Sequence, residues 1–402
     1  MARTAVTPSV TRGRTNRITA FRFVLAFGLV SALGDVVYEG ARSIIGPLLA
    51  HFGASAVIVG VITGIGEAVA LGFRLFTGRL ADRTNRPWPQ TIVGYALTMI
   101  CVPLIALSTG IAFAAALYNG ERFGKAIRAP SRDIMLAHAS AQLGRGRAFG
   151  LHEALDQCGA LVGPLAIAAF LAVGGSLNHA FAILALPGAV ALAVLMRLRL
   201  AVPHPEKYDP DNEASAKLLT IDVRLPRQFW LYAAFAASTM LGFATWAVLA
   251  FHLAVRHVVS PSLIAVLYAG AMGAAALAAL VFGRLYDRVG LRGLVVLPPL
   301  AAIVPWLSFQ TSVVAVTVGA LLWGVAMGVH ESTMRAAVTD LVPARRRGAG
   351  YGTFTAIYGL AWLAGSALIG LLYEHGVAAV GWFVLVVQVV AFALLGVVLR
   401  SR

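Results

Sequence analysis

The sequence predicts an all-α membrane protein built from two similar halves, and three observations support that fold. Hydrophobic residues make up 59% of the 402 residues and charged residues only 12%, a composition too apolar for a soluble domain. Apolar segments long enough to cross a bilayer, about 20 residues, recur along the whole chain. A short basic stretch also occurs twice at half-chain distance, which indicates an internal repeat.

Twelve apolar segments follow one another in two sets of six. We therefore expect twelve transmembrane helices in two pseudo-symmetric six-helix bundles, at 22–198 and 228–402. Residues 1–21 are expected to form a cytoplasmic tail, and the proline-rich interval 199–227 a cytoplasmic linker. The first apolar segment is too long for a signal peptide and is expected to be a retained helix. The segments are 22–50, 55–77, 90–109, 111–138, 146–174, 178–198, 228–255, 262–282, 292–310, 312–338, 347–373 and 377–399.

The net charge of +15 is interpreted as a signal of membrane orientation. Most lysines and arginines lie at the chain ends or in alternate loops, as the positive-inside rule predicts. We therefore expect no nucleic-acid partner, but a monomer in the lipid bilayer of a bacterial cytoplasmic membrane, with both termini cytoplasmic. Cys101 and Cys158 offer neither a disulfide framework nor a metal-binding spacing, so no metal and no cofactor are expected.

The repeated basic stretches are Gly78–Arg86 (GRLADRTNR) and Gly283–Arg292 (GRLYDRVGLR), and Gly283 lies 205 residues after Gly78. Their eighth residues, Asn85 and Gly290, are of the types that most readily adopt a positive φ. We expect two tight, positively charged hinge loops. The candidate gating residues are Gly78, Asp82, Arg83, Gly283, Asp287 and Arg288.

The pattern Gly-x-Leu-x-Asp-Arg-x-Gly resembles the signature loop of the major facilitator superfamily of secondary transporters. The second copy fits throughout, whereas the first departs at Asn85. The resemblance extends from about Phe21 to Arg400. It implies a small-molecule site between two bundles and transport by alternating access.

A second element, Gly159-Ala-Leu-Val-Gly163-Pro164, resembles the Gly-x-x-x-Gly-Pro element of the drug/proton antiporter subgroup. The two glycines are expected to allow close helix packing, and Pro164 to bend its helix. This resemblance favours export over uptake.

Ionisable residues inside the spans are expected to mark the transport pathway, because charge is costly in a bilayer. Asp35, Glu39 and Arg42 share one face of the first span, and Glu67 lies midway along the second. A buried carboxylate without a nearby cation favours its neutral form, a property that a proton carrier needs. A static ion pair such as Glu39 with Arg42 is the alternative. The candidate proton-coupling residues are Asp35, Glu39, Glu67 and Glu121.

The fourth span carries a dense charged stripe, which either lines a water-filled cavity or is neutralised by Glu153 and Asp156 of the fifth span. A salt-bridge network is expected where Arg128 and Arg132 approach those carboxylates. Glu121, Arg122 and Lys125 are the better candidates for substrate contact or proton relay.

The second half contributes few charges and many aromatic residues. Glu331 and Arg335 are expected to pair at i, i+4, and His330 either senses protons or only packs. One charged wall and one apolar wall suit an amphipathic organic substrate. The candidate cavity residues are Arg42, Arg122, Lys125, Arg128, Glu331, Arg335, Trp246, Trp323 and Tyr358.

The sequence thus favours proton-coupled export of an amphipathic organic compound by a secondary transporter. Proton symport, and export of an anion or a metal chelate, remain open alternatives within that class. Outside it, the alternatives are a non-transporting membrane sensor and a membrane-embedded enzyme. An enzyme is not expected, because the chain has no His-Glu-x-x-His and no Gly-x-Ser-x-Gly motif.

Overall fold

The structure is a computed structural model that describes residues 17–84, 86–209, 225–343 and 347–401, and all regular elements within these ranges are helical. Short 3₁₀ turns, η1 (Ile105–Leu107), η2 (Pro205–Tyr208) and η4 (Gly290–Val296), connect or extend the α-helices. The first half contains α1 (Ala20–His51), α2 (Ala56–Gly72), α3 (Arg74–Thr84), α4 (Pro87–Leu104), α5 (Ile111–Leu143), α6 (Arg145–Ala172), α7 (Leu177–Ala182) and α8 (Ala185–Ala201). The second contains α9 (Arg227–Leu241), α10 (Trp246–Val255), α11 (Pro261–Val289), α12 (Leu297–Ser308), α13 (Val313–Leu341), α14 (Arg347–Glu374) and α15 (Val377–Arg400).

The predicted all-α polytopic fold is confirmed. Ten helical segments are long and apolar enough to cross a membrane, and one of them, Pro261–Ser308, holds both α11 and α12. The long helix α5 is outside these ten, because its charged stripe lowers its hydropathy. Each of the twelve predicted segments corresponds to one long helix or to two consecutive elements. The second, sixth and seventh segments are interrupted, the seventh by the non-helical residues 242–245 between α9 and α10.

The two repeated basic stretches are helical rather than loops, which corrects the prediction. Gly78, Asp82 and Arg83 lie in α3, while Gly283, Asp287 and Arg288 lie near the end of α11. No proline interrupts the first seven residues of either stretch, so α3 continues as far as Thr84 and α11 as far as Val289. The expected positive φ is found at Gly290, where φ is 61° and α11 ends. Asn85 and the side chain of Asp82 lie outside the described residues.

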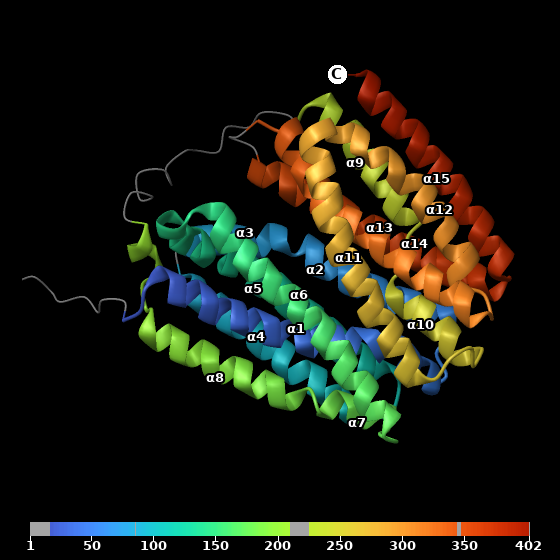
Figure 1. Cartoon of the computed structure of the whole chain (residues 1–402), viewed down its shortest axis with the longest axis horizontal. Helices are drawn as coiled ribbons and strands as arrows, with labels where there is room; N and C mark the ends of the chain where they lie inside the picture. Colours follow the sequence, from blue (N-terminus) through green and yellow to red (C-terminus); the bar gives the residue numbers. More distant parts are fainter. Residues whose placement is uncertain (1–16, 85, 210–224, 344–346, 402) are drawn as a thin grey trace, which may run out of the picture.

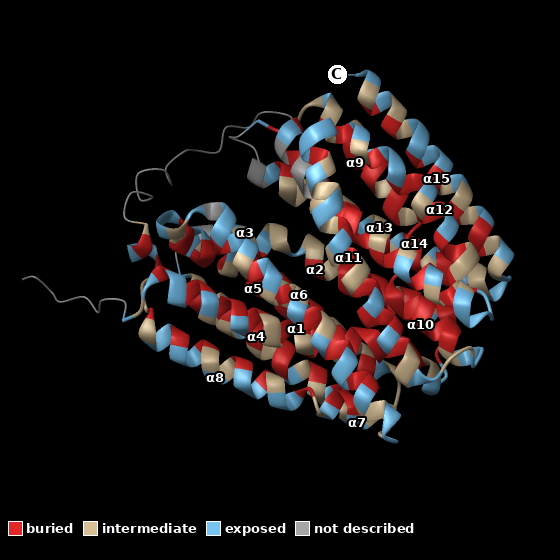
Figure 2. Cartoon of the chain, in the orientation of Figure 1, coloured by how far each residue is buried: buried red, intermediate tan, exposed pale blue. Residues whose placement is uncertain are grey.

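Helices of the two halves gather into two groups that meet at one end and diverge toward the end where α1 begins and α15 ends (Figure 1). We call the end where the groups meet the opposite end, and the other one the terminal end. Buried residues are densest around α10, near the opposite end (Figure 2). The span formed by α9 and α10 is the most buried of the ten, with 78% of its apolar window inside the protein. Of its two helices, α10 contacts α1 and α2 of the first half, whereas α9 packs mainly against α14 and α15.

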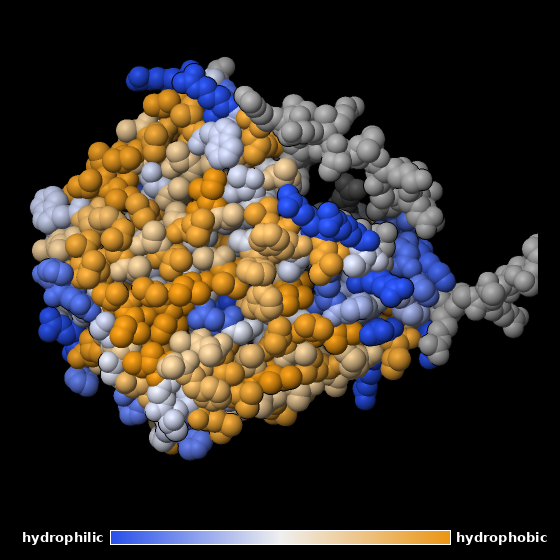
Figure 3. All heavy atoms as spheres, turned by 180° about the vertical axis from the view of Figure 1, so that it is seen from behind, coloured by the Kyte–Doolittle hydropathy of each residue, from blue (hydrophilic) through white to orange (hydrophobic). Residues whose placement is uncertain are grey.

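Hydrophobic residues cover most of the face shown in Figure 3, and hydrophilic residues gather toward its ends. Large apolar side chains are exposed on several helices, among them Phe76 at 63%, Val314 at 75% and Trp382 at 61%. Such a surface would aggregate in water but suits contact with lipid. The protein is therefore a multi-pass membrane protein.

Glycines allow the backbones of the two halves to touch near the opposite end. A Cβ atom added at Gly46 of α1 would lie 2.2 Å from the carbonyl oxygen of Ala247 in α10. One added at Gly60 of α2 would lie 2.2 Å from the carbonyl oxygen of Ser366 in α14. Small residues permit this close approach between membrane helices. Thr63 Oγ1 and Thr245 Oγ1, 2.7 Å apart, add a hydrogen bond between the halves.

We predict that Gly46→Ala destabilises this closed arrangement by about 1–3 kcal/mol, because the new methyl group must push α10 away. The measurements are the apparent Tm in detergent and maleimide labelling at Thr245→Cys, which should become faster. Gly72→Ala is the control, since a Cβ there has no neighbour within 4 Å. Equal Tm values for the two variants would contradict the role of Gly46.

Candidate functional site

Five charged side chains from α1, α2 and α5 form a buried group, the charged cluster: Glu39, Arg42, Glu67, Glu121 and Arg122. Arg42 Nη2 donates to Glu67 Oε1 at 2.7 Å, and Arg122 Nη1 lies 3.5 Å from the same oxygen. The Glu67 carboxylate therefore lies between two guanidinium groups. Because each of these charges is removed from water, each requires a partner of opposite sign.

The remaining two carboxylates of the charged cluster each approach one arginine. Glu39 Oε1 lies 3.6 Å from Arg42 Nη1, so the ion pair considered as the alternative for Glu39 is present. Glu121 Oε2 lies 2.6 Å from Arg122 Nε, and the Arg122 side chain is completely buried. Three carboxylates and two guanidiniums leave one formal negative charge if all are ionised. Lys125, one turn from Glu121 on α5, supplies a compensating positive charge.

The ring of Tyr38 on α1 is surrounded by three cations of α5. Lys125 Nζ lies 4.2 Å from the ring centroid, and the guanidinium carbons of Arg122 and Arg128 lie at 5.2 and 5.6 Å. Cations are attracted to the face of an aromatic ring. Lys125 is half-buried, and no ion pair within 4.0 Å is found for it among the described residues. Its ammonium group is held chiefly by this ring.

Asp35 differs from the carboxylates of the charged cluster. It is only 8% exposed, yet the described residues offer its carboxylate neither a salt bridge nor a hydrogen bond. It packs against α6, where a Cβ added at Gly159 would lie 2.9 Å from the Asp35 Cβ. The charges that act on it most strongly belong to Asp156 and Lys125. Asp35 is thus a buried acid without a fixed cationic partner.

The salt-bridge network predicted between the fourth and fifth spans is found in part. Arg132 Nη1 lies 3.6 Å from Asp156 Oδ2, as expected. Arg128 instead donates to Thr98 Oγ1 at 2.6 Å and lies 4.7 Å from the ring centroid of Tyr95, so its partners are a hydroxyl and an aromatic face. Glu153 is exposed and accepts a hydrogen bond from Gln157 at 3.1 Å.

A polar chain of three residues lies beside this network. His152 Nε2 and Tyr95 Oη each lie 2.8 Å from Ser31 Oγ, which joins α6, α1 and α4. Sequence reasoning missed this chain, because uncharged Ser and Tyr produce no signal in an apolar span. Ser31 does stand one helical turn before Asp35, a spacing that could have indicated a shared face.

On the side of the second half, Trp246 and Trp323 are completely buried. The Nε1 of Trp246 donates to the Ser43 carbonyl at 3.2 Å, and that of Trp323 donates to the Ala244 carbonyl at 3.0 Å. The Trp246 indole thus bonds to the backbone where the two halves meet, and the Trp323 indole bonds to the backbone at the break in the seventh span. The aromatic candidates are therefore part of the packing that supports the site.

Tyr268 of α11 connects the aromatic residues to the charged cluster, and no pattern in the sequence indicates this role. Its hydroxyl donates a hydrogen bond to Glu39 Oε2 across the two halves. Its ring lies 5.0 Å from that of Trp246. Nothing in the sequence pairs these residues, which are 229 positions apart.

Four rings of the second half form a closed circuit, the ring cluster: Phe243, His330, Tyr358 and Trp362. The centroid distances around the circuit are 5.3, 5.8, 6.2 and 6.4 Å. The Arg42 guanidinium lies 5.7 Å from the Trp362 ring centroid, so the ring cluster adjoins the charged cluster. Glu331 is exposed; its expected pair with Arg335 lies outside the description, because the Arg335 side chain is not described.

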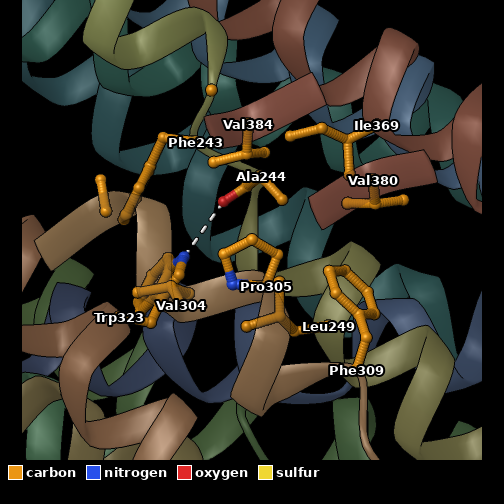
Figure 4. Close-up of a pocket in the computed structure, with 12 residues that line it drawn as sticks. Phe243, Ala244, Leu249, Val304, Pro305, Phe309, Trp323, Ile369, Val380 and Val384 are labelled. Carbon is orange, nitrogen blue, oxygen red and sulfur yellow. Dashed lines mark hydrogen bonds between the residues drawn. The ribbon is translucent and has the colours of Figure 1, made fainter. Parts of the chain in front are cut away.

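An apolar pocket borders the ring cluster within the second half (Figure 4). Phe243 and Trp323 lie on one side of it, and Ile369, Val380 and Val384 on another. All of the residues that line it are uncharged. The pocket has a volume of only about 10 Å³, so that Phe243, which is 2% exposed, remains almost fully packed.

Helices α1 and α6 pack with their backbones in contact through the two predicted glycines. A Cβ added at Gly159 would lie 2.1 Å from the Ala32 carbonyl oxygen, and one at Gly163 would lie 2.4 Å from that of Val36. Pro164 follows within the same helix. Any side chain at either glycine would force α6 away from Asp35.

An all-helical membrane fold in two halves, with buried charges and aromatic rings where they meet, defines a membrane transporter. The chain belongs to the Major Facilitator Superfamily, whose sequence profile matches residues 25–258 and 241–402. By family it is a secondary transporter.

Two relatives and two solved structures show the extent of the similarity. An uncharacterised protein of Mycobacterium tuberculosis is 47% identical over 388 residues, 95% of this chain and 93% of that protein. An uncharacterised MFS-type transporter of Methanocaldococcus jannaschii is 24% identical over 366 residues, 87% and 88% of the two chains.

Among solved structures, a bacterial homologue of the human lysosomal transporter Spinster, in an inward-facing and occupied conformation, has a TM-score of 0.69 at 17% identity. It covers 97% of this chain and 98% of its own. A POT family transporter in complex with 5-aminolevulinic acid has a TM-score of 0.74 at 13% identity, over 94% and 96%. At these identities the structures establish a shared fold alone.

We predict that Glu67→Gln lowers the free energy of unfolding by roughly 3–5 kcal/mol, because it leaves two buried guanidiniums without their shared carboxylate. The measurement is the apparent Tm of the purified protein in detergent. Glu153→Gln, the same change at an exposed position, should stay within about 0.5 kcal/mol. Similar Tm values for the two variants would show that Glu67 does not hold the charged cluster together.

Proposed function

We propose that this transporter couples the export of an amphipathic organic compound to proton entry, as a monomer in a bacterial cytoplasmic membrane. Both termini are on the cytoplasmic side in this proposal, supported by the distribution of basic residues in the sequence. The single observation that carries the proton coupling is the environment of Asp35.

A proton carrier must exchange its proton during the transport cycle, so its charge cannot be fixed by a permanent partner. Glu67 lies between two arginines, and Glu39 and Glu121 each approach one. Asp35 is buried to a similar degree but has no such partner among the residues described. Burial without a counterion favours the neutral acid, so Asp35 is the carboxylate best suited to bind and release a proton.

The amphipathic character of the substrate is supported by the two unlike surfaces that meet between the halves. One is the charged cluster of α1, α2 and α5, and the other is the ring cluster of the second half. They touch where Arg42 lies against Trp362. A compound with a polar and an apolar part would match both surfaces.

Export is the proposed direction of transport. Its support is the close packing of Gly159 and Gly163 against α1, in the element that resembles the drug/proton antiporter subgroup. One observation favours a second candidate, proton symport of an organic anion: Lys125 is held mainly by the Tyr38 ring and is available for a negative group.

We predict that inside-out vesicles with an acidic lumen release protons when the correct compound is added. A pH-sensitive dye reports the release, and pools of cationic, neutral and anionic compounds are tested in turn. Asp35→Asn should abolish the signal, because an amide cannot carry the proton. Glu153→Gln should retain it.

Three results would contradict this proposal. Substrate movement without proton release would exclude antiport. Proton uptake with an anionic pool would favour the symport alternative. Full coupling in Asp35→Asn would remove that residue from the mechanism while leaving antiport in place.

A further inference from the structure

Two polar side chains of the ring cluster are buried without hydrogen-bond partners. His330 and Trp362 are each 2% exposed. Among the residues described, no hydrogen-bond partner is found for either ring nitrogen of His330 or for the indole Nε1 of Trp362. Folded proteins pair nearly all buried polar groups, because an unpaired one loses its contact with water and gains nothing. These three atoms therefore require an explanation other than packing.

The neighbouring tryptophans show that an unpaired indole is not a general feature of this interior. Trp246 and Trp323 each donate Nε1–H to a backbone carbonyl, although both are as deeply buried as Trp362. His252, the other deeply buried histidine of the second half, has a partner at each ring nitrogen, the Tyr373 hydroxyl at 2.8 Å and the Gln310 carbonyl at 3.1 Å. Single unpaired polar atoms also occur elsewhere in the described second half, at Thr239, Ser308 and Gln388. The ring cluster differs from these sites because it holds three such atoms on two aromatic side chains.

The unpaired atoms belong to rings that lie next to the charged cluster. Trp362 lies beside the Arg42 guanidinium, on the side where the two halves meet. Phe243 and Tyr358 complete the circuit and present aromatic surface. Phe243 also borders the small apolar pocket of the second half (Figure 4).

The chemistry of the three atoms defines what they would bind. The indole Nε1–H is a donor only, while a neutral imidazole offers one donor and one acceptor. A hydroxyl group can accept a hydrogen bond from the indole and donate one to the imidazole. The surrounding rings favour a flat aromatic partner, through offset or edge-to-face stacking.

We infer that the ring cluster is a substrate subsite for a flat aromatic ring that carries a hydroxyl or similar hydrogen-bonding group at its edge. The inference rests on the proposed function and deepens it, because it specifies the apolar part of the amphipathic substrate. Trp362 donates to the edge group, His330 pairs with the same group, and Phe243 and Tyr358 pack against the ring. The charged end of the substrate faces the charged cluster.

The test uses 6-hydroxyquinoline and quinoline, which differ only in the hydroxyl group, and measures their affinity for the full protein in nanodiscs by titration calorimetry. The wild-type protein should bind 6-hydroxyquinoline roughly tenfold more tightly than quinoline. Trp362→Phe and His330→Leu should each reduce that ratio to about twofold or less, because each removes one hydrogen-bonding partner of the hydroxyl.

Trp323→Phe is the matched control for Trp362→Phe. It makes the same chemical change at an equally buried indole whose N–H already has a partner. It should keep the tenfold preference and lower the apparent Tm more than Trp362→Phe does, because it leaves the Ala244 carbonyl unpaired.

Absence of a preference in the wild-type protein, or a preference that survives both Trp362→Phe and His330→Leu, would overturn the inference. Proton release with other compounds, without this preference, would overturn the subsite but leave the proposed function standing. The hydroxyl preference without proton release by any compound would overturn the proposed function but leave the subsite standing.

Discussion

The pairing of the Glu67 carboxylate with Arg42 and Arg122 is the interaction on which the first half depends. It joins α1, α2 and α5 in a place from which water is excluded, where no single one of these charges could remain alone. The rest of the site is arranged around it: Glu39 and Glu121 each form an ion pair with one of the two arginines, and the Tyr38 ring lies against cations of α5. Asp35 is buried but is not part of this pairing, so no fixed cation among the described residues stabilises its ionised form.

The second half contributes contact surface rather than charge. Its aromatic rings reach the charged cluster at two points, the hydrogen bond from Tyr268 to Glu39 and the contact of Arg42 with the Trp362 ring. Each point couples a group of the charged cluster to a group across the boundary between the halves. A rearrangement of the halves must therefore change the surroundings of Glu39 and Arg42, and through them the charge balance near Asp35.

The architecture was predictable from sequence because the bilayer imposes it: apolar segments must be helical, and their basic ends show the repeat. The interruption at 242–245 was not predictable, since Gly242-Phe-Ala-Thr245 is apolar and contains no proline. The stretch at Gly283 is helical although its glycines and charged residues are typical of a loop. Within the site, charge spacing along the first span identified Arg42, and the position of Arg122 beside the charged stripe of the fourth span identified that residue. The sequence could not identify Tyr268 or the Ser31 chain, whose contacts join helices far apart in sequence.

The break in the seventh span has a mechanical consequence. Between α9 and α10 the backbone is served by side chains of neighbouring helices: Trp323 donates to the Ala244 carbonyl, and the Thr245 amide donates to Ser366 Oγ at 3.2 Å. The ten-residue α10 is thus not joined to α9 by a continuous set of helical hydrogen bonds. At the break between the two helices, the backbone bonds instead to side chains of neighbouring helices. The rigid contact of α10 is with α1, at Gly46. Tilting α10 with α1 would cost a few side-chain bonds and leave α9 in place, so that one end of the pathway can open without moving the whole second half.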